Sequence, residues 1–151
     1  MPTYKAPLRD MRFLINEVFD FESHYKTLPN GEEATPDMVE AILGELAKLC
    51  ENTIGPLYHS GDHESCKLED GQVTTPPGYK EAYQRYAEGG WQGLSLAAEV
   101  GGGGLPKSIA LAVVEIFTGA CSSFVMYPGL TVAVANLVKR MGNDWMLEVV
   151  L

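Results

Sequence analysis

Residues 109–138 have the sequence IALAVVEIFTGACSSFVMYPGLTVAVANLV, and this stretch decides the fold. It carries one charge, Glu115, and is long enough to cross a membrane, but glycines, serines and a proline interrupt it. We therefore expect a buried helical hairpin and no membrane span. One helix should cover residues 106–117 and the next about 122–141, with a bend at Pro128-Gly129.

Helical spacing of apolar residues predicts two further helices before this stretch. The first covers residues 8–21 and presents one apolar face. The second begins at Thr35-Pro36-Asp37, which combines a capping hydroxyl, a proline at the first helical position and an acid in the first turn. It continues to Ile54 and ends at Gly55-Pro56.

A third helix begins at Tyr79 and stops at Gly89-Gly90. Residues 58–78, which precede it, are polar and rich in turn-forming pairs, so we expect an ordered surface loop there. No convincing alternation of apolar and polar residues occurs anywhere in the chain. The predicted fold class is therefore all-α.

The composition is that of one soluble globular domain. The chain has 151 residues, of which 46% are hydrophobic and 21% charged. Its net charge of −9 repels nucleic-acid backbones and anionic membrane surfaces, which excludes nucleic acid as a partner. Three cysteines, an odd number without regular spacing, and the lack of a leader segment favour the reducing cytoplasm.

Four residues in and before the polar loop are candidate zinc ligands: Cys50, His59, His63 and Cys66. Their spacing fits none of the regular zinc signatures. We favour surface histidines and a cysteine that packs inward. No metal is predicted.

Gly101–Gly104 is a candidate phosphate cradle, because glycine lets backbone N–H groups approach an anion closely. The phosphate fingerprints need a preceding strand and a GK[ST] or GxGxxG frame, and neither is present. We favour a conformational joint or a tight passage of the backbone.

Candidate catalytic side chains are scarce. No GxSxG elbow occurs, and no histidine lies near Ser122 or Ser123 in the sequence, so a nucleophile relay is not predicted. Glu115 is isolated on an apolar helix, and a buried carboxylate can act as a base. Such a residue is more often paired with a neighbour or placed at the exposed edge of its helix, so Glu115 is given no catalytic role.

Small and soft side chains gather on the last predicted helix. This group consists of Ser123, Met126, Tyr127, Gly129, Leu130 and Ala133. Small residues can leave a groove for an apolar chain, and methionine adapts to what fills it. Close packing between helices explains the same residues equally well, and both alternatives stay open at this point.

Four ordered motifs carry a family resemblance. They are PGYKEAY at 77–83, EGGWQGLS at 88–95, EVGGGGLP at 99–106 and YPGL at 127–130. Together they resemble the N-terminal region of an acyl-CoA dehydrogenase. The opening YKAPLRDMRF at 4–13 is similar to the extension of the longer branch, which includes the methylmercaptopropionyl-CoA dehydrogenases, and Gly61-Asp62 and Cys66 also fit that branch. The resemblance covers residues 3 to about 144.

The resemblance implies an up-and-down helical N-terminal domain, which the family continues with a β-domain and a C-terminal helical bundle. It also implies FAD, α,β-dehydrogenation of an acyl-CoA substrate, an electron-transfer flavoprotein as acceptor, and a homo-oligomer. It places five residues on the helix that lines the acyl site, as substrate-binding candidates: Met126, Tyr127, Gly129, Leu130 and Ala133.

The chain departs from the family pattern near its end. Leu151 precedes the family's β-domain, with most flavin-binding motifs, and the C-terminal domain with its catalytic glutamate. We therefore expect no catalytic residue and no bound FAD in this chain alone. Residues 145–151 replace a charged stretch of the family with an apolar tail, which suggests truncation or a frame change. We divide the chain into an N-terminal extension helix at 1–35, the helical domain at 36–144 and the atypical tail.

Two functions follow from these observations. The leading hypothesis is the N-terminal helical domain of a flavin-dependent acyl-CoA dehydrogenase, which lines the acyl pocket and is inactive alone. The alternative is a non-catalytic helical protein-interaction module that uses the apolar hairpin at residues 106–141. Downstream DNA that encodes a β-rich segment followed by helices would favour the enzyme.

Overall fold

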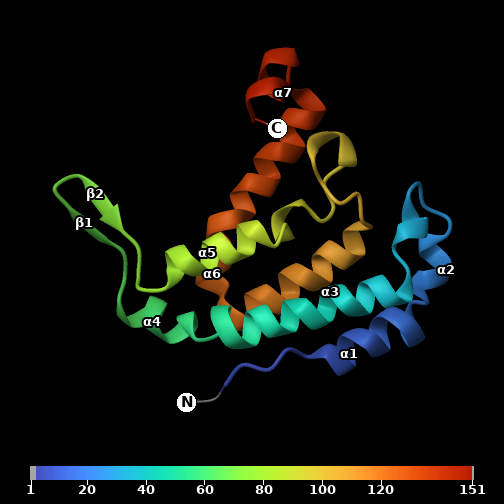
Figure 1. Ribbon diagram of the computed structural model, residues 1–151, viewed down its shortest axis with the longest axis horizontal. Coiled ribbons are helices and arrows are strands. Elements are labelled where there is room, and N and C mark those ends of the chain that lie inside the picture. Colours follow the sequence, from blue (N-terminus) through green and yellow to red (C-terminus); the bar gives the residue numbers. More distant parts are fainter. Residues whose placement is uncertain (1–2, 151) are drawn as a thin grey trace.

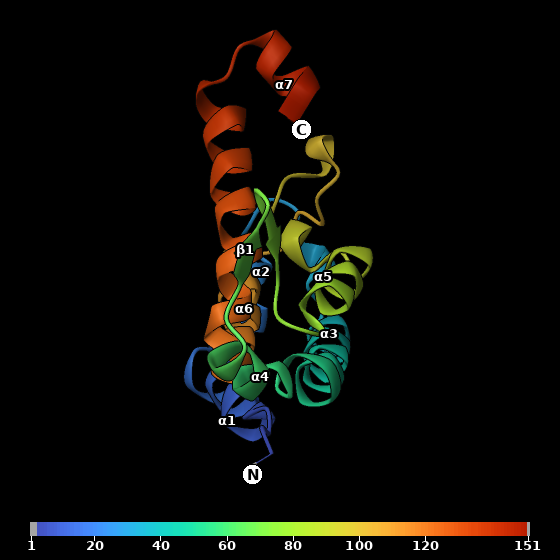
Figure 2. The ribbon, with the colours of Figure 1, turned by 90° about the vertical axis from the view of Figure 1, so that its left-hand side faces the viewer.

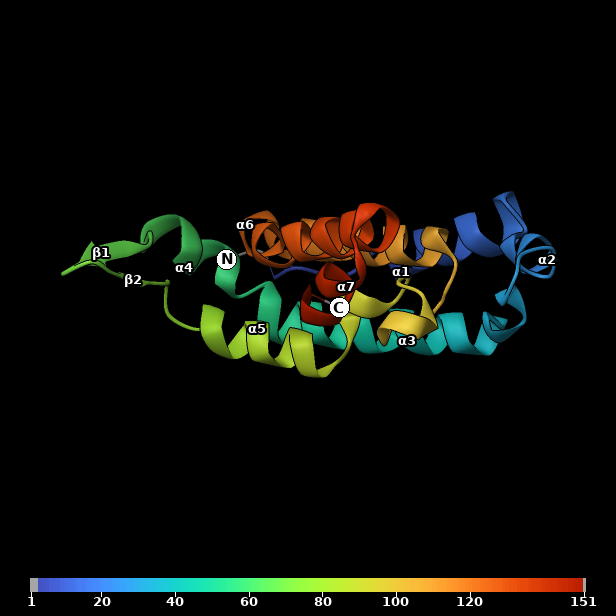
Figure 3. The same cartoon turned by 90° about the horizontal axis from the view of Figure 1, so that it is seen from above.

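The computed structural model describes residues 3–150, with side chains to Val149, and its main helices form two layers (Figure 1). One layer holds α3 (Pro36–Leu49) and α5 (Tyr79–Glu88), and the other holds α1 (Leu8–Arg12) and α6 (Lys107–Met141), as the view from above shows (Figure 3). Along the chain these four helices run in alternate directions (Figure 1). The expected all-α, up-and-down domain is confirmed.

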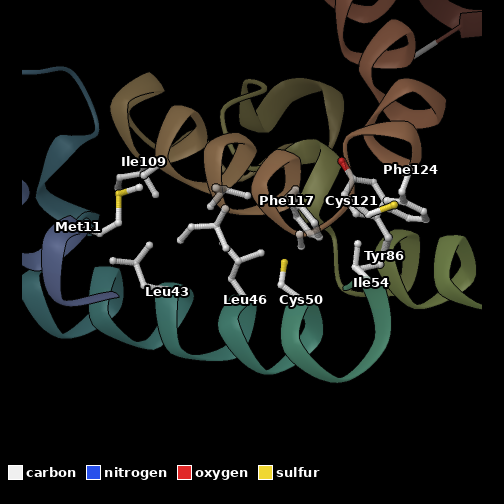
Figure 4. Close-up of a cluster of buried hydrophobic side chains, with 14 of the residues drawn as sticks. Met11, Leu43, Leu46, Cys50, Ile54, Tyr86, Ile109, Phe117, Cys121 and Phe124 are labelled. Atoms are coloured by element: carbon white, nitrogen blue, oxygen red, sulfur yellow. The ribbon is translucent and has the colours of Figure 1, made fainter. Parts of the chain in front are cut away.

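The core lies between the two layers, where α3 faces the N-terminal half of α6 (Figure 4). The largest fully buried side chains here are Leu43, Leu46, Cys50, Ile54, Ile109, Ile116, Cys121 and Phe124, each at most 1% exposed. Burial of apolar side chains from both helices is what holds the layers together. Met11 of α1 closes one end of this core (Figure 4).

The second predicted helix has the expected bounds. Thr35 is its N-cap, because the Thr35 Oγ1 accepts a hydrogen bond of 3.2 Å from the Met38 N–H. α3 continues without interruption as a π-helical turn, η3 (Cys50–Ile54), in which the Gly55 N–H donates to the Cys50 carbonyl at 2.7 Å. The sequence signals for both ends were therefore sound.

The first predicted helix, residues 8–21, is present but ends at Val18. α1 continues as a π-helical segment, η1 (Phe13–Val18), and Asp20 then adopts a left-handed conformation with φ of 44°. Because a left-handed residue ends a right-handed helix, α2 (Phe21–Tyr25) starts in a new direction. A 3-10 turn, η2 (Gly31–Glu33), leads on to α3.

The expectation of a loop over residues 58–78 is wrong, because the segment holds α4 (Leu57–His63) and a hairpin of β1 (Lys67–Glu69) and β2 (Gln72–Thr74). Asp70 and Gly71, with φ of 48° and 79°, form the two-residue turn that pairs Leu68 with Val73. These strands are too short to show an alternating pattern.

Gly61, which argued for the loop, lies inside α4. A Cβ at this position would collide with the Tyr79 hydroxyl, so glycine is needed for the close approach of α4 and α5. The small residue therefore serves packing and does not break the helix.

The connector between α5 and α6 contains two 3-10 turns, η4 (Trp91–Gly93) and η5 (Ala98–Val100). The glycine run folds back on it, with N–H groups of Gly103 and Gly104 donating to carbonyls of Gly93 and Leu96 at 2.9 and 2.8 Å. A side chain at Gly102 would collide with the Leu96 carbonyl. The tight passage is confirmed, and these N–H groups are not free to hold a phosphate.

α6 breaks at Cys121, whose φ of −160° and ψ of 94° are not helical. The predicted separation of a helix ending at Phe117 from one beginning near Ser122 is confirmed by this break, whereas the additional bend predicted at Pro128-Gly129 is wrong. Proline removes only one backbone hydrogen bond, and here the helix runs through Pro128 without interruption. At the break, the Tyr79 hydroxyl lies 2.7 Å from Ser123 Oγ and 3.5 Å from Cys121 Sγ, so α5 holds the distorted backbone in place.

The C-terminal half of α6 leaves the bundle and rises toward α7 (Asp144–Val150) (Figures 1 and 2). The expected buried hairpin is thus wrong, because most side chains beyond the break are exposed. Within residues 3–150, α6 is the one helix long and apolar enough to span a membrane by length and composition. Core helices of soluble proteins meet the same criterion, and 44% of its apolar window is buried, so this is weak evidence for a span.

Two leucines test the interface between the layers. Leu46 is 0% exposed on α3, whereas Leu111 is 69% exposed on the facing helix α6. Leu46→Ala should lower the free energy of unfolding by ~2–5 kcal/mol, because it leaves a cavity in the core. Leu111→Ala should change it by less than about 0.5 kcal/mol. Urea denaturation followed by circular dichroism measures both, and equal losses would contradict the assigned core.

Candidate functional site

An apolar hollow lies at the break in α6. We call it the α6 cleft; its volume is about 280 Å³. The lining comes from both halves of α6, the end of α5 and the connector: Tyr86, Trp91, Gln92, Leu94, Ser95, Ala110, Val113, Val114, Phe117, Phe124, Val125, Pro128, Gly129 and Val132. The cleft exists because the two halves of α6 diverge at Cys121.

Aromatic rings form one wall of the α6 cleft. The Phe117 ring meets Tyr86 and Trp91 edge-on, with ring centroids 5.2 and 5.9 Å apart. Phe124, beyond the break, meets Tyr86 at 6.0 Å. Edge-to-face pairs of this kind fix ring positions beyond simple burial, so this wall is rigid.

Gly129 leaves the opposite side of the cleft open. A Cβ built on Gly129 would have no atom within 4 Å, and its backbone is ordinary helix. The glycine is therefore required neither by packing nor by conformation. Its effect is to leave space.

The polar groups of the α6 cleft are few. Gln92 Oε1 is a buried acceptor without a hydrogen-bond partner among the described residues. Burial raises the pKa of Tyr86 to about 12, with a smaller contribution from Tyr83. No aspartate, glutamate, histidine, lysine or arginine lines the cleft. The arrangement can hold an apolar chain but offers no side chain for proton transfer near neutral pH.

The five predicted substrate-binding residues do not share one surface. Gly129 lines the α6 cleft, whereas Met126 and Leu130 are 71% and 70% exposed. Ala133 is also exposed, on the same side of the helix as Met126 and Leu130. Tyr127 faces a second hollow, described next. Their role as acyl contacts stays a prediction.

The second hollow, of about 480 Å³, lies between the hairpin, α5 and α6. It is lined by Val73, Thr74, Thr75, Tyr79, Lys80, Tyr83 and Tyr127. The Tyr127 hydroxyl lies 3.5 Å from Cys66 Sγ, and this contact, with burial, raises the pKa of Tyr127 to about 12. Tyr127 therefore joins the hairpin to α6 instead of closing the α6 cleft.

The zinc candidates are dispersed. Cys50 is fully buried and is the cysteine that packs inward, while Cys66 is exposed. Cys66 directly precedes β1, and the hairpin of β1 and β2 projects from the bundle (Figure 1). His59 and His63 are exposed, with ring centroids 4.2 Å apart. Within residues 3–150, no three His, Cys, Asp or Glu side chains gather closely enough to hold a metal.

Glu115 is exposed on α6 and lies outside both hollows. The exposed-edge interpretation, favoured from the sequence, is confirmed. A residue there contacts neither wall of the α6 cleft and takes no part in what the cleft binds.

Sequence reasoning missed most of the cleft. The missed helix residues are Val125, Pro128 and Val132, and a signal for them was present. Together with Gly129 they recur at steps of three and four, which places them on one side of the helix. The small-residue pattern instead selected the face centred on Met126 and Leu130, more than about a third of a turn away.

The fold and site define a class of protein: an up-and-down helical domain with an apolar cleft at a helix break and no catalytic acid or base in it. The family model of the acyl-CoA dehydrogenase N-terminal domain matches residues 37–151. The chain belongs to this family. The resemblance seen in the sequence motifs is confirmed, and the proposed division at residues 35/36 and 144/145 stays a prediction.

Three curated relatives give the same result. The chain is 39% identical over 142 residues to 3-methylmercaptopropionyl-CoA dehydrogenase of Ruegeria pomeroyi, covering 94% of the chain and 24% of the relative. It is 27% identical to a broad-specificity linear acyl-CoA dehydrogenase of Mycobacterium tuberculosis and 24% identical to butyryl-CoA dehydrogenase of Syntrophomonas wolfei. These matches cover 95% and 96% of the chain and 24% of each relative. The chain thus spans about a quarter of the length of the relatives it matches.

Buried tyrosines predict a stability change at high pH. In the folded chain the pKa of Tyr86 rises from 10.0 to about 12 because of burial. Below pH 10 both states keep the proton, so the full contribution is present. Above pH 10 the unfolded state loses its proton first, and the free energy of unfolding should fall up to about pH 12. Urea denaturation between pH 9 and pH 12 should show a smaller fall in the free energy of unfolding for Tyr86→Phe than for the parent chain.

Tyr58→Phe is the matched control, since the Tyr58 side chain is 62% exposed. It should leave the fall in stability as it is in the parent chain. The same attenuation in both variants would show that burial of Tyr86 is not the cause.

Proposed function

We propose that this chain supplies one wall of the acyl-binding site of a flavin-dependent acyl-CoA dehydrogenase and performs no chemistry by itself. The observation that carries the proposal is the α6 cleft, an apolar hollow with a rigid aromatic wall and space at Gly129. An acyl chain needs such a hollow, because it gains free energy from leaving water and from contact with apolar walls.

The contribution of the domain would be position and the exclusion of water. A fixed wall limits where the chain of a bound thioester can lie, and removal of water strengthens polar interactions at the reacting carbons. The acid or base that moves a proton would belong to another part of a longer protein. The names of the three relatives, all acyl-CoA dehydrogenases, support this division of labour.

The residues of this chain do not fit FAD. A flavin dinucleotide needs donors for its pyrophosphate, and the N–H groups of Gly102, Gly103 and Gly104 are already bonded to carbonyls of the connector. The α6 cleft holds no basic side chain that would replace them. We therefore assign FAD to the longer protein and derive no step through it.

The remaining partners belong to the same proposal. Acyl-CoA is the substrate class, an electron-transfer flavoprotein the acceptor, and a homo-oligomer the assembly. The cytoplasm fits a chain whose cysteines are all free, with Cys50 and Cys121 buried as thiols.

The size of the cleft at Gly129 should set the acceptable chain length. The chain has two tryptophans, and Trp145→Phe leaves Trp91, which lines the α6 cleft. The fluorescence of Trp91 then reports whether an ester occupies the cleft. Saturated acyl-CoA esters should bind the parent protein more tightly as the acyl group becomes longer. Gly129→Leu should weaken the long esters about tenfold, within the ~1–3 kcal/mol that overpacking costs, and spare the short ones.

Gly44→Leu is the matched control, because Gly44 lies within α3, away from the cleft, and a Cβ there also meets nothing within 4 Å. It should leave binding unchanged at every length. Equal weakening of all esters by Gly129→Leu, or no response of Trp91 to any ester, would contradict the assignment of the cleft.

The division of labour makes a separate prediction. The purified chain should show no flavin absorption band and should not oxidise an acyl-CoA with an artificial electron acceptor. Exchange of residues 3–144 into the matching segment of the Ruegeria pomeroyi relative should give a coloured protein with acyl-CoA dehydrogenase activity. Stoichiometric flavin in the isolated chain, or a folded and coloured chimera without activity, would refute it.

A further inference from the structure

Gln92 carries a polar atom that the fold leaves without a partner. Its side-chain oxygen, Oε1, is buried and accepts no hydrogen bond from the described part of the chain. A buried acceptor without a donor costs free energy, because nothing replaces the hydrogen bond that water gives it in the unfolded chain. Buried polar atoms are nearly always paired, so this exception needs a physical explanation.

The backbone next to Gln92 is fixed at the α6 cleft. Gln92 is the middle residue of η4, which ends at Gly93. The Gly93 N–H donates to the Gly90 carbonyl at 3.0 Å, and the Gly93 carbonyl accepts from the Gly103 N–H at 2.9 Å. These bonds keep Gln92 in the wall of the cleft, which its side chain lines.

The cleft itself does not supply the missing donor. Three other side chains that line it carry donor groups, Tyr86, Trp91 and Ser95, and none of them bonds to Gln92 Oε1. A segment packed on the outside of the domain does not reach an atom that is already buried inside it. The donor must therefore come from a molecule that enters the cleft. The terminal torsion of glutamine is soft, so a small rotation of the amide turns Oε1 toward such a molecule.

The lining of the cleft restricts the kind of donor. No acidic or basic side chain lines it, so a charged donor such as an ammonium group would be buried without a counter-charge. The volume of about 280 Å³ and the aromatic wall suit a narrow apolar chain. A hydroxyl group is a neutral donor that adds little width to such a chain.

We propose that the α6 cleft selects acyl groups that carry a hydroxyl group, and that this hydroxyl donates a hydrogen bond to Gln92 Oε1. The inference rests on the proposed function and names the class of acyl group, whereas the space at Gly129 concerns its length. A plain saturated chain also enters, but it leaves the acceptor unpaired. A site with such a polar group discriminates against the ligand that lacks the matching group.

Paired esters test the hydroxyl. The chain with Trp145→Phe is titrated with decanoyl-CoA and with hydroxydecanoyl-CoA esters that carry the hydroxyl at successive carbons, and Trp91 fluorescence reports binding. At the carbons that reach Gln92, the hydroxyl should strengthen binding about tenfold more in the parent than in Gln92→Met. Methionine keeps the length of glutamine without its amide, and comparison of the two ratios cancels the cost of taking the hydroxyl out of water.

Gln84→Met is the matched control, because Gln84 is exposed on α5 and its amide donates to Glu88 at 2.8 Å. It should leave the preference for the hydroxyl as it is in the parent. A methoxydecanoyl ester is the control on the ligand, since its oxygen accepts but does not donate, and it should show no gain. Gln92→Leu repeats the test with a second apolar side chain, and circular dichroism shows whether each variant keeps the parent fold.

The outcomes separate this inference from the proposed function. An equal preference for the hydroxyl in the parent and in Gln92→Met would overturn the inference alone. So would a gain for the methoxy ester, which would show that Gln92 donates. Equal weakening of every ester by Gln92→Met, acetyl-CoA included, would place the donor outside the acyl group and also overturn it. No response to any ester would contradict the proposed function, and this inference with it.

Discussion

The contact of the Tyr79 hydroxyl with the side chains of Ser123 and Cys121 joins α5 to the break in α6, and the α6 cleft depends on that break. Tyr79 is 4% exposed and reaches Ser123 and Cys121 from α5. On one side of the break the two halves of α6 separate around the cleft, and on the other side the C-terminal half stands clear of the bundle. A continuous α6 would not form this cleft.

Much of the fold was predictable because local signals agreed with packing. Thr35-Pro36 marks the start of α3, and Gly89-Gly90 the end of α5, by the same chemistry in sequence and structure. The misses have one physical origin. Glycine and proline normally interrupt helices, but here tertiary contacts keep Gly61 and Pro128 within helices. Gly61 leaves room for the Tyr79 side chain, and Pro128 is buried within α6. The interruption between residues 117 and 122 was expected from Gly119 and the serines that follow it, whereas its support by Tyr79, more than forty residues away in sequence, is a tertiary contact that no local pattern shows.

The candidate site was less predictable than the fold, because it depends on which side of one helix faces inward. Gly129 was identified, while Val125 and Val132 were missed. Composition does not separate the two faces: one is valine and proline, the other methionine and leucine, and both are apolar. The orientation is set by the break and by the connector at Trp91, which are tertiary features. The C-terminal half of α6 is apolar on both faces, so apolarity alone does not identify the pocket.

The reaction rates of the three free thiols report local opening of the fold. Cys66 is exposed, whereas Cys50 in the core and Cys121 at the break are 0% exposed, and burial raises the pKa of Cys50 to about 12. A thiol reagent therefore modifies Cys66 at once and reaches Cys50 and Cys121 only through fluctuations of the fold. Cys50 becomes accessible to the reagent when η3, which continues α3, separates from α6. Cys121 becomes accessible when the backbone at the break rearranges. The ratio of their modification rates measures whether the hinge moves independently of the bundle, without any engineered label.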